Sequence, residues 1–140
     1  MTKRIDKLCL LKERAVDAAE GASAQARAEA TAAEHVLAAT EKAWDEALER
    51  YARATTIADL VDADARARSL RQAVQRAEAS LTAKCADVER RRGSVAAART
   101  ELRRFEMWGE RADATATVSS SRLARNAEDA LAARTRGSHE

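Results

Sequence analysis

A seven-residue repeat of small and apolar positions runs through both halves of the chain and constrains the fold more than any other feature. In the first half, one row contains Cys9, Val16, Ser23, Ala30, Leu37, Trp44 and Tyr51, and its companion contains Ile5, Lys12, Ala19, Ala26, Ala33, Thr40, Ala47 and Ala54. In the second half, one row runs from Leu60 through Ala67 and Val74 to Ala130, and its companion runs from Ala63 through Leu70 to Ala133. Paired rows at this spacing are the a and d positions of a coiled coil, and sustained heptads predict a left-handed supercoil.

The two halves are out of register with each other, which predicts a turn between them. The first row would continue from Tyr51 to positions 58 and 65, whereas the second row occupies positions 60 and 67. The break falls in residues 55–64, where Thr56-x-x-Asp59 resembles a capping box. One continuous helix with a stutter is the alternative, because the segment contains neither glycine nor proline.

These patterns predict an all-α fold, an antiparallel two-helix coiled-coil hairpin with unequal long helices. We expect helices over about residues 3–55 and 60–135, a single domain over residues 1–134 with its turn near 55–64, and a disordered tail over 135–140. The absence of proline and the presence of only four glycines favour long helices. Alanine supplies much of the apolar content, so the predicted core is thin.

Charge and hydropathy exclude several classes of function. Lysine and arginine total 25 and aspartate and glutamate 23, for a net charge of +2. Nucleic-acid binding usually requires a strongly basic face, so we expect no nucleic-acid partner. No apolar run approaches the roughly 20 residues of a membrane span, and the short apolar patch near the N-terminus does not fit a signal peptide. We therefore expect a cytoplasmic protein.

The chain contains no constellation that predicts catalysis, a metal site or a cofactor. His35 lies on a predicted helix without a second histidine near it, and His139 lies in the predicted tail. In the antiparallel pairing, Cys85 falls near residue 31 and Cys9 near residue 107, so the two thiols are too far apart for a disulfide. We expect a non-enzymatic protein that works by binding other proteins.

Arginine and aromatic residues provide the candidate contacts, because these residue types anchor many protein interfaces. They occur in the run Arg90-Arg91-Arg92 and in the segment Glu101–Arg111. Phe105 lies on the seam row and is expected in the core, while Trp108 either widens that core or contacts a partner. The candidates for partner binding in these segments are Arg90, Arg92, Arg103, Arg104, Glu106, Trp108 and Arg111.

Apolar residues at the predicted turn form a second candidate surface. Tyr51, Ile57, Leu60 and Val61 would lie at the open end of the hairpin. They either present a binding surface or pack against each other to close the turn.

The sequence resembles the central-stalk proteins of flagellar and type III secretion systems, the FliJ/YscO-like family. The resemblance covers nearly the whole chain and rests on three segments. They are Ile5-x-x-Leu8-x-x-Leu11-Lys-Glu-Arg14, Arg103-Arg104-Phe105-Glu106-x-Trp108-x-Glu110-Arg111 and the acidic pair Glu128-Asp129. The chain departs from the family pattern at Gly109 and at the serines 119–121.

The resemblance implies a non-catalytic stalk that enters the pore of a hexameric secretion ATPase and couples it to the export gate protein, with export chaperones as further partners. It implies a position peripheral to the secretion apparatus at the inner membrane, and a monomer or weak homo-oligomer. Arg103, Arg104, Glu106, Trp108 and Arg111 would face the ATPase, and residues 51–61 the gate. The alternatives are a scaffolding coiled coil that forms homo-oligomers and a helical chaperone or secreted substrate.

Overall fold

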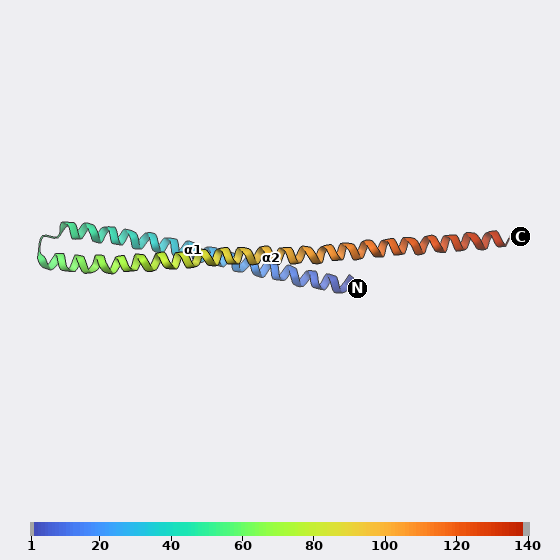
Figure 1. Ribbon diagram of the computed structural model, residues 1–140, viewed down its shortest axis with the longest axis horizontal. Helices are drawn as coiled ribbons and strands as arrows, with labels where there is room; N and C mark the ends of the chain where they lie inside the picture. Colours follow the sequence, from blue (N-terminus) through green and yellow to red (C-terminus); the bar gives the residue numbers. More distant parts are fainter. Residues whose placement is uncertain (1, 139–140) are drawn as a thin grey trace. The chain divides into compact units, whose positions relative to one another are not determined.

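A computed structural model describes residues 2–138, and these residues form two helices joined by a short turn (Figure 1). Helix α1 comprises Thr2–Arg53 and helix α2 comprises Ile57–Gly137. No strand occurs in this part of the chain. The fold is therefore the predicted all-α antiparallel hairpin of two unequal long helices, and the alternative of one continuous helix is wrong.

The chain divides into two compact units, each built from a segment of α1 and a segment of α2. The turn unit comprises residues 17–97, and the terminal unit comprises residues 1–16 and 98–140. Each helix contributes a segment to both units, because the two antiparallel helices of a hairpin pair along their lengths from the turn outwards. The expectation of one domain over residues 1–134 stays a prediction.

The turn occupies residues 54–56 and is closed by hydrogen bonds that need neither glycine nor proline. The amide of Ala54 donates to the carbonyl of Tyr51 over 3.3 Å, which ends α1. The hydroxyl of Thr56 accepts from the amide of Asp59 over 3.1 Å, and the Thr56 carbonyl accepts from the amide of Leu60 over 3.0 Å. Thr56 is thus the predicted N-cap. Most of the expected turn region, residues 57–64, already belongs to α2 because this cap starts the helix at Ile57.

The buried residues lie on the predicted heptad rows. All eight buried apolar residues occupy these rows, and five of them are alanines: Val16, Ala26, Ala30, Ala47, Ala67, Val74, Ala77 and Val95. Small side chains let two helix backbones approach closely, but each contributes little buried area. The seam therefore determines which helix faces meet, but it contributes little to the stability of the hairpin.

One position of the seam in the turn unit is occupied by an ion pair. The ammonium of Lys84, on the companion row, donates to the carboxylate of Glu29 over 3.0 Å. Gln25 donates to the other carboxylate oxygen over 3.3 Å. The hydrogen bond from Lys84, then that from Gln25, lowers the pKa of Glu29 below its ordinary value of 4.5. The pair joins α1 to α2 and favours this register over shifted ones.

In the terminal unit, the rows are covered only as far as α1 extends. Leu102, Phe105, Gly109 and Ala112 are half-buried, whereas every described residue from Asp113 onwards is exposed apart from Ala132. A methyl group built on Gly109 would lie 3.2 Å from a side-chain methyl of Ile5, which places the start of α1 against this position. The heptad rows continue beyond Ala112 without a helix to cover them.

The C-terminal end of α2 differs slightly from the expected boundary. The helix continues through Gly137, whereas the sequence predicted a tail from residue 135. The hydroxyl of Thr135 donates to the carbonyls of Leu131 and Ala132 over 3.1 and 2.9 Å, and the amide of Ser138 donates to the Arg134 carbonyl over 3.2 Å. These bonds continue the last turn. Residues 139 and 140 of the predicted tail, including His139, lie outside the described residues.

Substitution by alanine is expected to change the stability of the fold differently at two glycines inside α2. An added methyl at Gly93 meets no atom within 4 Å, whereas at Gly109 it meets Ile5 at 3.2 Å. Alanine gains about 1 kcal/mol over glycine in a helix interior. We expect Gly93→Ala to raise the free energy of unfolding by about this amount and Gly109→Ala to raise it less or lower it. Urea denaturation followed by circular dichroism measures both, and an equal gain at the two sites would contradict the close approach of Ile5.

The pair of Glu29 and Lys84 predicts a pH-dependent contribution to stability. Because the folded pKa of Glu29 lies below 4.5, the ionised pair stabilises the fold above that value and is lost as the pH falls through the folded pKa. We expect wild type to exceed Glu29→Gln in stability near pH 7, with the difference vanishing in acid. Urea denaturation of both proteins across this range measures it. A difference that is constant with pH would show that the carboxylate contributes through packing alone.

Candidate partner-binding surfaces

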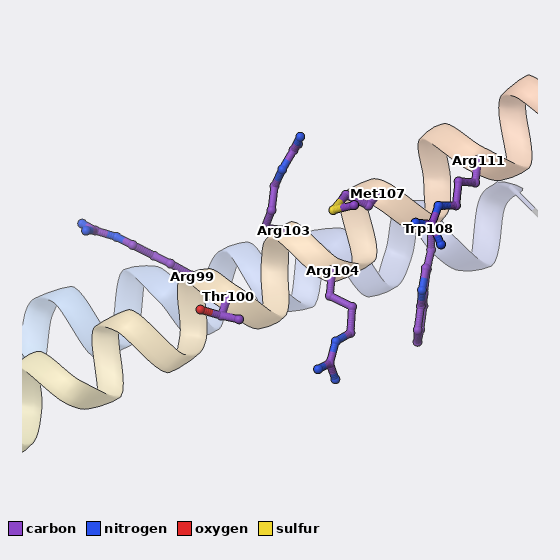
Figure 2. Close-up of a pocket in the computed structure, with 7 residues that line it drawn as sticks. All are labelled: Arg99, Thr100, Arg103, Arg104, Met107, Trp108 and Arg111. Atoms are coloured by element: carbon purple, nitrogen blue, oxygen red, sulfur yellow. The ribbon is translucent and has the colours of Figure 1, made fainter.

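A shallow groove rich in arginine lies on α2 in the terminal unit. It has a volume of about 530 Å³, and we call it the basic groove. Figure 2 shows its side chains extending from one helix, with Arg99 and Arg103 on one side and Arg104 and Trp108 on the other. Its lining comprises Arg99, Thr100, Arg103, Arg104, Met107, Trp108 and Arg111.

Helical geometry explains why these side chains gather on the face opposite the seam. Residues four apart lie on one side of a helix, so Arg99, Arg103, Met107 and Arg111 form one stripe. The seam residues Leu102 and Phe105 lie on the other side and turn toward α1. The basic groove is therefore open to a partner while the hairpin is intact.

Glutamates on the same helix hold two of the groove arginines in place. The guanidinium of Arg103 lies 3.4 Å from a carboxylate oxygen of Glu106 and 3.5 Å from one of Glu110, and that of Arg104 lies 3.5 Å from Glu101. Exposed pairs of this kind contribute about 0–1 kcal/mol. A carboxylate on a partner protein can therefore replace them at little cost, and Glu106 acts here by orienting Arg103.

An aromatic cluster connects the basic groove to the start of α1. The rings of Phe105 and Trp108 meet edge to face with centroids 5.0 Å apart. The ammonium of Lys12 lies 5.4 Å from the Phe105 centroid and 3.5 Å from the carboxylate of Glu101. Phe105 is half-buried, as its seam position predicted, whereas Trp108 remains 48% exposed. Trp108 thus packs on one edge and offers the other to the groove.

Cys9 lies on the seam near this cluster as a free thiol. Burial, followed by the negative charges of Glu106, Asp6 and Glu13, raises its pKa above the ordinary value of 9.0. The thiolate is the reactive form of cysteine, so the raised pKa lowers the fraction of Cys9 in that form. Cys85, in the turn unit, is also free.

Arg90 and Arg92 lie outside the basic groove. Both belong to the turn unit, where Arg90 pairs with Asp87 over 2.7 Å and Arg92 with Glu89 over 3.2 Å. The structure thus brings together Arg103, Arg104, Trp108 and Arg111 of the candidate residues and leaves these two apart. The sequence reasoning missed Arg99, Thr100 and Met107, although the spacing of four from Arg99 to Arg111 would have identified two of them.

The apolar residues at the turn divide into two groups. Tyr51, Leu60 and Val61 line one shallow groove together with Asp64 and Arg68, which we call the tip groove. Ile57 does not line it and is 82% exposed. Three of these residues thus gather around a shared groove while the fourth remains open to solvent, and a binding role for this region stays a prediction.

The described residues contain neither a metal-binding cluster nor a membrane-spanning helix. No group of three or more histidine, cysteine or acidic side chains within residues 2–138 is placed to hold a metal ion. No helix in that part of the chain is long and apolar enough to cross a membrane.

The described residues define an antiparallel coiled-coil hairpin of two long helices whose polar stripes face outward. The model of one protein family, described as the flagellar FliJ protein, matches residues 1–137. The chain therefore belongs to the FliJ family, whose members are structural components of the flagellar export apparatus, as the resemblance implied. Searches of curated proteins and of solved structures gave no match.

The aromatic cluster predicts unequal effects of truncating its two rings. Phe105 is covered by Lys12 and Trp108, so we expect Phe105→Ala to destabilise the terminal unit by about 2 kcal/mol, less than a fully buried phenylalanine would. Trp108→Ala should cost about 1 kcal/mol, because half of its surface is already exposed. Hydrogen exchange of amides in residues 3–16 and 98–112 measures both, and a larger loss for Trp108→Ala would reverse the assigned roles.

Proposed function

We propose that this protein is the central stalk of a flagellar or type III export ATPase complex and that it performs no catalysis itself. The match to the flagellar FliJ family over residues 1–137 carries the proposal. In this role the hairpin enters the pore of a hexameric secretion ATPase and couples ATP hydrolysis to the export gate protein. The site of action is cytoplasmic, peripheral to the secretion apparatus at the inner membrane, and export chaperones are further partners.

The basic groove is the proposed contact with the ATPase. Four arginines line it, and two of them, Arg103 and Arg104, pair with the half-exposed glutamates Glu106 and Glu101. An acidic surface of the ATPase pore can exchange with those glutamates, and the exposed edge of Trp108 adds an apolar anchor. Arg111 extends the same stripe by one more turn of α2.

The tip groove is the proposed contact with the export gate. Tyr51, Leu60 and Val61 present apolar surface beside the ion pair of Asp64 and Arg68, whose charged atoms lie 3.1 Å apart. Ile57 lies at the same end of the turn unit and is almost fully exposed. An apolar patch bordered by charges is typical of protein-binding surfaces, and a stalk needs a second contact at a distance from its ATPase contact.

Stimulation of the secretion ATPase encoded in the same genome tests the first contact. We expect the purified chain to increase ATP hydrolysis and the double variant Arg103→Glu, Arg104→Glu to lose most of that increase. Charge reversal places carboxylates against Glu101, Glu106 and Glu110, which costs only a few tenths of a kcal/mol per pair in the helix. Circular dichroism on the same samples checks that the helices are retained.

Two further variants sharpen this experiment. Arg103→Gln with Arg104→Gln removes the charge without repulsion and should lower stimulation less than the glutamates do. Arg71→Glu with Arg76→Glu makes the same change in net charge at exposed positions of the turn unit and should leave stimulation intact. Stimulation that survives every groove variant would place the contact elsewhere. The absence of both stimulation and binding would exclude the stalk role.

A further inference from the structure

The first four turns of α1 present a basic face that none of the surfaces above includes. Its residues recur at helical spacing, all of them are exposed, and no groove described above contains any of them. We call it the N-terminal basic face, and it comprises Lys3, Arg4, Lys7, Leu10, Leu11 and Arg14.

This face points away from α2. The seam side of the same turns is formed by Ile5, Cys9 and Lys12, which are half-buried, and Ile5 approaches Gly109 of α2. Positions 3, 7 and 14 lie on the opposite side of the helix from positions 5, 9 and 12. The basic face is therefore not used in holding the hairpin together.

The four cations of the face have no ion-pair partner among the residues that the structure describes. Among residues 2–138, no carboxylate lies within ion-pair distance of Lys3, Arg4, Lys7 or Arg14. The first turn of α1 also contains no acidic residue. Cations at a helix N-terminus oppose the helix dipole, so Lys3 and Arg4 lower the stability of α1 and are not explained by the fold.

Two adjacent leucines lie among these cations. Leu10 is 49% exposed and Leu11 is 57% exposed. The acidic residues of these turns, Asp6 and Glu13, lie on the flank between the leucines and the seam, close enough to Cys9 to raise its pKa. The outer face thus combines four cations with apolar surface, and its acidic neighbours Asp6 and Glu13 border it on the side of Leu10.

We propose that the N-terminal basic face binds the surface of a bilayer that contains anionic phospholipids. The cations would contact lipid phosphates while Leu10 and Leu11 enter the boundary between headgroups and acyl chains, as in amphipathic helices that lie at a membrane surface. A convex helix face with no hollow suits a plane better than it suits a protruding side chain of a partner protein. This binding goes beyond the proposed stalk function and requires no ATPase.

Co-sedimentation of the full chain with vesicles tests the proposal. We expect binding to vesicles of phosphatidylglycerol and phosphatidylcholine, little binding to phosphatidylcholine alone, and loss of binding at high salt. Each cation near an anionic surface contributes about five-fold in partitioning, or about 1 kcal/mol. The double variant Lys7→Glu, Arg14→Glu should therefore bind at least about 25-fold more weakly.

The matched control places the same change in charge on another face of the terminal unit. Arg122→Glu with Arg125→Glu alters two exposed arginines of α2 and should reduce vesicle binding by much less. An equal loss in the two double variants would mean that net charge alone drives binding, which would overturn the assignment to this face. Circular dichroism confirms that each variant retains its helices.

Tryptophan emission provides a second test that depends on the leucines. Leu11 and Val36 are each 57% exposed, so Leu11→Trp and Val36→Trp give matched probes on α1 when Trp44 and Trp108 are replaced by phenylalanine in both chains. We expect anionic vesicles to shift the emission of Leu11→Trp to the blue and to leave that of Val36→Trp unchanged. Equal shifts in the two variants, or no shift in either, would overturn the proposal.

Vesicle binding and ATPase stimulation can fail independently, so the two proposals are distinguishable. Suppose that Lys7→Glu, Arg14→Glu leaves vesicle binding unchanged but abolishes stimulation of the secretion ATPase. The face would then be a contact with an acidic protein surface, and the membrane proposal would be wrong. Loss of vesicle binding with normal stimulation would support the membrane proposal.

Discussion

The close packing of small side chains between α1 and α2 is the interaction on which the rest of the molecule depends. Alanines such as Ala26 and Ala47 are almost completely buried, yet each contributes far less to stability than a leucine in the same place. A seam of this kind is stable only if each segment already has a high intrinsic propensity to form a helix. The absence of proline and the abundance of alanine, arginine and glutamate meet that condition, while the pair of Glu29 and Lys84 favours one register.

A thin seam also determines where function can lie. Two helices in contact leave no interior large enough for an enclosed site, so every binding surface is an outward stripe of one helix or a shallow groove along the hairpin. The basic groove and the N-terminal basic face belong to the same terminal unit but to different helices, and both face away from the seam. Ion pairs restrain Arg103 and Arg104 in the first, whereas the cations of the second are unpaired. The two surfaces are therefore suited to different partners.

Most of the fold could be predicted because it depends on local patterns. The residues that are buried within 3–138 all lie on the heptad rows, and Thr56 was recognisable as an N-cap from its spacing to Asp59. The site was predicted less completely. The arginine and aromatic motif named Arg103 and Trp108, which line one groove, together with Arg90, which belongs to the other unit. Sequence proximity does not show which residues share a helix face, and Arg99 was missed for the same reason.

The sequence by itself determined that this chain forms two long helices, where they are interrupted and which face of each is apolar, since these properties follow from helix propensity and from a period of seven. Only the tertiary structure decided where the pairing stops. The packing of Ile5 against Gly109 places the start of α1, so the rows beyond Ala112 remain exposed although their pattern continues unchanged. A heptad repeat determines which face of a helix is apolar, but it does not determine whether another helix covers that face. Covering it requires a second helical segment at the same position along the hairpin.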